Sequence, residues 1–228
     1  MSLPLVIGRG SHLTGAILPP GSSVEIIPQA ITLSAAEPIG ATTLAVAPLT
    51  QPLTASVAAP LYLTFSDAVD GGDRPVIITA SAAIGATSLT CLPLHAPISN
   101  NSIAPFPVVL QARTSAGITT SANDVTTTTF ETGFFEDGIV SRVGLTLDAP
   151  GNYLPTDSGY KTVQDAFYRP SNIWLSLFLP IPGGYTTGQV YKGVASVTKC
   201  DIKDDAGGII ALDMTFKFRG APIITYPS

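Results

Sequence analysis

The sequence contains few charged residues. Of its 228 residues 12% are charged, with 11 Lys or Arg against 16 Asp or Glu and a formal net charge of −5. Soluble domains usually carry about 25% charged residues, so much of this surface is uncharged. The Lys and Arg residues form no cluster, and proteins that hold nucleic acid do so by neutralising phosphates. The composition therefore argues against a nucleic-acid-binding protein.

Cysteine and histidine are equally scarce, with two of each. Cys91 and Cys200 are too few for a disulfide framework, and we expect both to be buried free thiols. Cys91 and His95 have the spacing of a zinc-ligand pair, but no second pair completes a tetrahedral site. Neither His12 nor His95 lies in a recognisable nucleophile motif. We predict no metal, no cofactor and no catalytic residue, so the chain is not expected to be an enzyme.

Long hydrophobic runs are absent, although 45% of the residues are apolar. The densest run, Ile173–Pro182, is half the length of about 20 residues that a membrane-spanning helix needs. The first residues lack the basic region of a secretory signal, so we expect neither a signal nor a membrane segment. Apolar content without such segments favours a surface covered by other copies of the chain, the alternative being a large apolar β-core.

Two groups of carboxylates could act as sites, and for both we expect solvated loops. The first group consists of Asp67, Asp70 and Asp73. It lacks the residue spacing and the bidentate glutamate of an EF-hand calcium site. The second group consists of Glu131, Glu136 and Asp137. Paired carboxylates can act as general acid and base, but the sequence does not give their separation in space.

Proline and glycine are abundant, at 20 and 21 residues, and they separate short segments rich in Val, Ile, Thr and Leu. This pattern predicts a mainly β protein with many turns. We divide the chain into a β domain formed by 1–30 and 112–228 and an inserted module at 31–111. In the lead-in, Ser23–Ile27 is expected to form a short strand.

The inserted module consists of two repeats, 31–66 and 76–111. They are identical at 11 of 36 aligned positions, and the phrase "IGAT" occurs in both. One copy has too few strands to bury its own apolar face, so we expect the two copies to close one small barrel or sandwich.

For residues 112–228 the sequence pattern predicts a strand at Ile139–Asp148, then a helix, a second strand and a hairpin. The helix has Asp157 or Ser158 as its cap and ends at Pro170. The next segment is apolar on both faces, which indicates either a central strand or a strand covered by a neighbouring subunit. Its candidate inter-subunit side chains are Ile173, Leu175, Leu177 and Leu179.

This order of elements, with "NDVTTTTFETG", "GNY", "TVQDAFYRP" and "GGYTTGQVYKGVASVT", resembles the tail tube (major tail) proteins of tailed bacteriophages. The resemblance covers roughly residues 120–228, and the repeated module resembles Ala/Thr-rich inserts of some phage tail proteins. It implies a β-sandwich or barrel with one flanking helix, forming hexameric rings that stack into a tube. The implied partners are copies of the chain and other tail proteins, such as sheath, baseplate or terminator. The implied location is the virion tail, assembled in the host cytoplasm.

The resemblance also implies that genomic DNA passes through the tube without specific binding. An acidic lumen suits this passage, because a basic wall would hold phosphates. The candidate lumen or ring-contact residues are Asp201, Asp204, Asp205 and Asp213, with a solvated turn as the alternative. Two other functions are open: a capsid decoration or tail terminator protein, and a carbohydrate-binding adhesive module.

Overall fold

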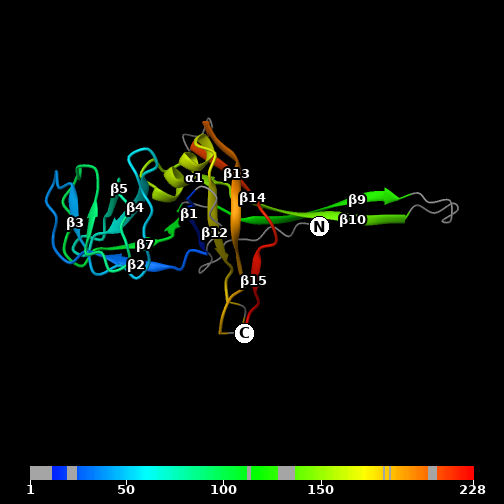
Figure 1. Cartoon of the computed structure of the whole chain (residues 1–228), viewed down its shortest axis with the longest axis horizontal. Helices are drawn as coiled ribbons and strands as arrows, with labels where there is room; N and C mark the ends of the chain where they lie inside the picture. Colours follow the sequence, from blue (N-terminus) through cyan, green and yellow to red (C-terminus); the bar gives the residue numbers. More distant parts are fainter. Residues whose placement is uncertain are drawn as a thin grey trace.

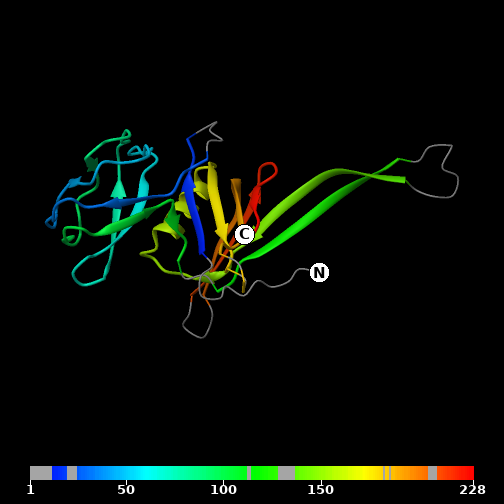
Figure 2. The same cartoon turned by 90° about the horizontal axis from the view of Figure 1, so that it is seen from below.

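The computed structural model describes residues 12–19, 25–111, 114–127, 137–181, 183–184, 186–204 and 210–228. Within these ranges the protein is mainly β, with antiparallel strands and one helix, as the sequence predicts. A small barrel lies at one end of the long axis, a large sheet with its helix in the middle, and a two-stranded ribbon at the other end (Figures 1 and 2).

The small barrel consists of six short strands: β2 (Gln29–Thr32), β3 (Thr43–Ala45), β4 (Leu61–Ser66), β5 (Asp73–Ile78), β6 (Ser88–Thr90) and β7 (Ile103–Phe106). Four of them form a sheet in the order β2-β7-β4-β5, and β3 pairs with β6. Two single bridges join these two sheets into a closed ring of strands. Leu33–Val46 connects the end of β2 to the end of β3, and Ile78–Cys91 connects the end of β5 to the end of β6.

The strand pairing inside the barrel has an approximate two-fold axis that exchanges the two repeats. Equivalent residues of the repeats are 45 positions apart in the sequence. In the β3–β6 ladder Leu44 lies opposite its own counterpart, Leu89. The bridges also occur in related pairs: Leu33–Val46 with Ile78–Cys91, and Glu37–Ile98 with Leu53–Ala82. Each repeat therefore supplies the partner strand that the other repeat needs.

Burial follows the same relation. Equivalent side chains of the two repeats share one hydrophobic core: Ile31 and Val76, Leu33 and Ile78, Leu44 and Leu89, Leu49 and Leu94, Leu53 and Ile98. The symmetry fails at the last strand, since β7 pairs with β4 only at Ser66–Ile103, and the cis bond Phe106–Pro107 follows. The chain leaves the barrel at this point.

The large sheet holds the remaining strands in the order β8-β1-β12-β13-β14-β10-β9. Their bounds are β1 (His12–Ile17), β8 (Val108–Val109), β9 (Gly117–Thr127), β10 (Asp137–Asp148), β12 (Asn172–Phe178), β13 (Val190–Asp204) and β14 (Ile210–Phe218). Two short strands pair with members of this path, β11 (Gly151–Asn152) with β14 and β15 (Ile223–Thr225) with β13.

The predicted helix is confirmed as α1 (Ser158–Tyr168). The Asp157 carboxylate accepts a hydrogen bond from the backbone N–H of Gly159 at 2.8 Å and so caps the first turn. Tyr160 and Val163 pack into the core of the large sheet, which contains none of the barrel's buried residues.

One predicted strand is wrong. The described part of Ser23–Ile27, Glu25–Ile27, is irregular, and the strand of this region is β2, which begins at Gln29. Ile26 packs against the barrel core without joining a ladder. Pro28, the residue before β2, has no N–H to donate to a ladder. Gln29 pairs with Phe106, so the chain enters and leaves the barrel side by side.

Candidate assembly surfaces

The ribbon formed by β9 and β10 extends beyond the large sheet (Figure 2). The two strands pair along their full length, from Gly117–Asp148 to Thr127–Asp137. Only the last residues of β10, Thr146–Asp148, pair with β14. Beyond them, in the described backbone, each strand of the ribbon has one edge without a strand beside it, and the ribbon runs away from the sheet (Figure 2). We call the part of the ribbon beyond this pairing, residues 120–127 and 137–145, the arm.

Unpaired strand edges carry rows of unused N–H and C=O groups, which pair readily with another chain. A two-stranded ribbon on its own is at best marginally stable in water. The arm is therefore a surface that a neighbouring molecule would stabilise. The sequence predicts the strand that becomes β10 but gives no strand for β9. The β-branched residues of "GITTSANDVTT" are the signal that could have found it.

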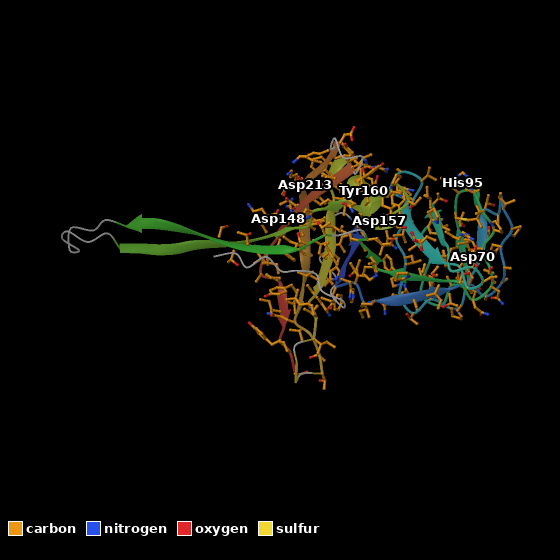
Figure 3. The ribbon with its side chains drawn as sticks, turned by 180° about the vertical axis from the view of Figure 1, so that it is seen from behind. Asp70, His95, Asp148, Asp157, Tyr160 and Asp213 are labelled. Carbon is orange, nitrogen blue, oxygen red and sulfur yellow. The ribbon has the colours of Figure 1, made fainter. Side chains whose placement is uncertain are left out.

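The open face of β13 and β14 carries charges of both signs. Asp201 lies directly opposite Asp213, an arrangement that is unfavourable for two like charges. Lys199 relieves it, with its Nζ 3.8 Å from Asp201 and 3.3 Å from Asp213, and Lys203 Nζ lies 2.8 Å from Asp213. Figure 3 shows Asp213 and Asp148 on this part of the sheet.

The lysines change the acidity of this group. The hydrogen bond from Lys203, with the further bond and charge of Lys199, lowers the pKa of Asp213 below its ordinary value. The same contact raises the pKa of Lys203. Two of the four predicted lumen carboxylates, Asp201 of β13 and Asp213 of β14, are thus neutralised by the β13 lysines. Asp204 ends β13 and is exposed, and Asp205 lies outside the described residues.

The predicted inter-subunit strand is β12, and it lies inside the protomer. Its two edges pair with β1 and β13 of the same chain. Ile173, Leu175 and Leu177 belong to the core under α1, and Leu179 packs against that core just beyond the strand. Ile173, Leu175 and Leu177 are buried and Leu179 is half-buried, so the pairing fits the other interpretation of the sequence, a central strand.

Contacts between the barrel and the large sheet gather around the start of α1. Thr64 of β4 and Ser158 share a hydrogen bond between their hydroxyls. The second carboxylate oxygen of Asp157 accepts from the Gln111 backbone N–H at 3.1 Å, just after the chain leaves β8. Tyr160 follows in the buried face of the helix, and burial raises the pKa of its hydroxyl to about 12.

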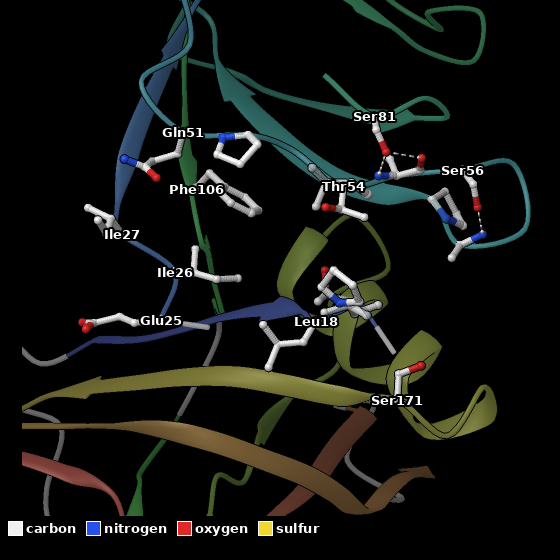
Figure 4. A pocket seen from close by; sticks show the side chains of 18 residues that line it. Leu18, Glu25, Ile26, Ile27, Gln51, Thr54, Ser56, Ser81, Phe106 and Ser171 are labelled. Atoms are coloured by element: carbon white, nitrogen blue, oxygen red, sulfur yellow. Dashed lines mark hydrogen bonds between the residues drawn. The ribbon is translucent and has the colours of Figure 1, made fainter. Parts of the chain in front are cut away.

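A cleft of about 660 Å³ opens where the barrel meets β1 and α1. Its lining is mostly aliphatic, with Leu18, Ile26 and Phe106 among its residues (Figure 4). Ser81 lies on its wall, but the Ser81 hydroxyl is engaged with the backbone N–H and C=O of Ala55. Glu25 is the one charged residue of the lining.

Most of the other candidate residues from the sequence are engaged in contacts that stabilise the fold. His12 stacks on Phe178 across β1 and β12, and His95 is exposed. Both cysteines are buried and outside any disulfide, as predicted. Asp67 accepts hydrogen bonds from the backbone of Val69, Asp70 and Ser99, which lowers its pKa and joins two loops.

Asp70 pairs with Arg74, and Asp73 begins β5. Glu131 and Glu136 lie outside the described residues, and Asp137 begins β10. Among the described residues no three His, Cys, Asp or Glu side chains gather as a metal site would require. In the same ranges no helix is long and apolar enough to cross a membrane.

No protein-family model matches the chain, and a comparison with curated proteins found no similar sequence. Among solved structures, the chain is similar to one from the tail of an empty gene transfer agent particle, refined as a helix with C6 symmetry. That match has 15% identity and a TM-score of 0.40, and covers 50% of this chain and 82% of the other. A chain from the virion of a native gene transfer agent particle matches with 15% identity and a TM-score of 0.42, over 50% of this chain and 85% of the other.

Proposed function

We propose that the protein is a structural subunit of a bacteriophage tail tube, forming hexameric rings that stack around a passage for DNA. The arm carries this proposal. An arm whose backbone edges are unpaired in the protomer gains most when a neighbouring copy lies beside it.

The arm also favours rings and stacks over a simple dimer. It lies at the end of the long axis opposite the barrel (Figure 1). We propose that a neighbour receives it on its sheet or barrel and not on its own arm, so that two different surfaces meet. Contacts between two different surfaces are heterologous, and they generate closed rings or open filaments. A tube of stacked rings contains contacts of both kinds.

The order of elements in 120–228 supports the same proposal. The tail tube resemblance rests on an amphipathic strand, a short capped helix, an apolar strand and a closing hairpin. The corresponding elements are β10, α1, β12 and the β13–β14 pair. Under this proposal β12 is the centre of the subunit wall, and subunits meet through the arm.

We further propose that the small barrel is an insertion that the tube subunit carries at the junction of Gln29 and Phe106. These two residues are ladder partners, so a short connection could replace the whole barrel. The wall needs only the core beneath α1, which contains no residue of 29–106; Ala16 of β1 and Val108 of β8 are the two large-sheet residues that pack into the barrel core instead.

Passage of DNA requires a wall that does not hold phosphates, and the net charge of −5 suits this. Because Lys199 and Lys203 neutralise Asp201 and Asp213, a negative lumen would have to come from other carboxylates such as Asp204. Replacing Asp201, Asp204, Asp205 and Asp213 by Lys tests the idea. Unchanged tube assembly and unchanged DNA ejection would remove these residues from the lumen.

The direct test of assembly shortens the arm. Ser121 and Gly144 are ladder partners, so an Asn-Gly turn can replace residues 122–143 and leave the pairing of β10 with β14 intact. We expect the wild-type chain to sediment as large assemblies at high concentration and the shortened chain to stay a folded monomer. A shortened chain that assembles as the wild type does would contradict the proposal.

A further inference from the structure

A groove of about 450 Å³ lies between α1 and the outer face of β4 and β5. It shares no lining residue with the cleft beside β1. The helix and β4 are joined at the start of α1, where the hydroxyls of Thr64 and Ser158 share a hydrogen bond. The groove opens farther along the helix, beside Tyr62, and we call it the α1–β4 groove.

The helix contributes the polar side chains of the groove. Lys161, Gln164, Asp165 and Tyr168 recur at the i, i+3, i+4, i+7 spacing that places side chains on one face of a helix. Tyr160 and Val163 lie on the buried side of α1 and belong to the core of the large sheet. The face of α1 that the core does not use is therefore the face that lines the groove.

The barrel contributes Tyr62 and Ile77, which are ladder partners in β4 and β5. Both lie on the outer face of the barrel, because the alternate residues Leu61, Leu63 and Ile78 are in its core. Side chains directly opposite each other in an antiparallel pair are neighbours, so Tyr62 and Ile77 form one wall.

Two tyrosines that are far apart in the sequence line this groove together. Tyr168 is 70% exposed, and its ring makes an edge contact with Phe167 at a centroid distance of 5.5 Å. Tyr62 is half-buried. Tyrosine has an apolar ring face and a polar hydroxyl tip, so it suits ligands that combine both characters. With most of its surface in solvent, Tyr168 adds little to the core, and the fold does not explain an aromatic residue there.

Asp165 is a charged group with little water around it. Its side chain is 10% exposed, and one carboxylate oxygen lies 2.6 Å from Arg169 Nη2. Burial raises the pKa of the Asp165 carboxyl, even though Arg169 acts to lower it. A ligand hydroxyl that donates to this carboxylate would replace part of the hydration lost on burial.

The charges of the lining balance, with one lysine and one aspartate. An anion would meet Asp165 as well as Lys161, so the balance favours a neutral ligand. Lys161 can donate hydrogen bonds, Asp165 can accept them, and the Gln164 amide and the tyrosine hydroxyls can do both. A ligand that satisfies these groups carries several hydroxyls on a frame with an apolar face. A sugar ring has this combination.

We propose that the α1–β4 groove binds a short neutral saccharide. One face of a sugar ring packs on Tyr168, and the ring hydroxyls bond to Asp165, Gln164 and Lys161. The volume of about 450 Å³ lies within the range of roughly 300–1,000 Å³ that is typical of small-molecule sites. The groove is formed by one protomer, so this binding does not depend on the assembly proposed above.

Glycan binding by the full chain tests the proposal. The chain is applied at low concentration to an array of neutral and anionic oligosaccharides. The neutral oligosaccharide that retains the most protein is then titrated by calorimetry against the wild type and the variants Tyr168→Ala, Asp165→Asn and Tyr226→Ala. Tyr226→Ala is the matched control, because Tyr226 is 68% exposed and lies outside the groove. Circular dichroism verifies that each variant keeps the fold.

We expect Tyr168→Ala to weaken binding about tenfold, because the stacking surface is lost. We expect a smaller loss in Asp165→Asn, since an amide oxygen still accepts a hydrogen bond but without the charge. Tyr226→Ala is expected to bind as the wild type does. Equal affinities of Tyr168→Ala and Tyr226→Ala would overturn the proposal. So would a wild-type chain that no neutral oligosaccharide retains, or one that binds anionic oligosaccharides alone.

Discussion

Leu44 and Leu89 test the two-fold relation at the scale of single residues. Both are fully buried, and they lie opposite each other in the β3–β6 ladder, beside the two-fold axis that relates the repeats. Truncating either to alanine leaves an equivalent cavity, so we expect Leu44→Ala and Leu89→Ala to lower the free energy of unfolding by similar amounts, about 2–5 kcal/mol each. Chemical denaturation measures both losses.

The exposed Ile39→Ala variant serves as the control, with an expected change within about 0.5 kcal/mol. A large loss in one leucine variant and almost none in the other would show that the two repeats do not share one symmetric core.

Asp213 makes a second prediction at this scale. The lysines hold its pKa below the ordinary value, so the folded state gains stability above the pKa of the unfolded chain, and this gain is lost as the pH falls through the folded pKa. In a Lys199→Met/Lys203→Met variant we expect the pKa of Asp213 to rise, since the opposed Asp201 then acts without compensation. Carboxyl NMR titration measures the shift.

Lys217→Met is the matched control, because Lys217 lies four residues further along the same strand. An Asp213 pKa that does not move in the double variant, or that moves equally in the control, would contradict the ion-pair assignment.

Among the elements, α1 depends on its cap. The two oxygens of Asp157 bind the N–H groups of Gly159 and Gln111, so one buried side chain joins the helix to the segment that follows the barrel. We expect Asp157→Ala to lower the free energy of unfolding by about 1–2 kcal/mol and Asp157→Asn to lose less, since an amide oxygen still accepts. Thermal unfolding of both variants against wild type measures the difference, and equal stability of all three proteins would contradict the role of the cap.

The elements also show what the sequence could predict. The helix was predictable because a cap, an apolar face and a proline agree between Asp157 and Pro170. The strand at Ser23–Ile27 was wrong because Ile26 packs against the barrel core from an irregular segment, and local pattern does not distinguish that from a ladder.

Tertiary placement of side chains was less predictable. The apolar faces of β12 fit a central strand and an inter-subunit strand equally well until its partners β1 and β13 are known. For the carboxylates of the closing hairpin, the sequence already placed lysines nearby, because Lys199, Asp201 and Lys203 lie at alternate positions on one face of a strand. Their neutralisation of Asp213 appears only with the register of β13 and β14.

At the scale of the whole molecule, the core beneath α1 contains no barrel residue, although Ala16 of β1 and Val108 of β8 pack into the core of the barrel. A chain in which two glycines replace residues 29–106 keeps β1, β8 and the core beneath α1. We expect this shortened chain to fold and to assemble, with reduced stability because Ala16 and Val108 lose the barrel core and Ser158 loses its contact with Thr64. Circular dichroism and sedimentation measure both properties, and a chain that does not fold would show that the barrel is part of the wall.

The account as a whole depends on self-assembly through the arm. Negative-stain electron microscopy of the concentrated full chain tests it most directly. The account predicts long hollow tubes of stacked rings, with the small barrels repeating along them. Solitary particles that remain single at every concentration would contradict it, and closed discs that never stack would assign the chain to a single-ring role such as a terminator.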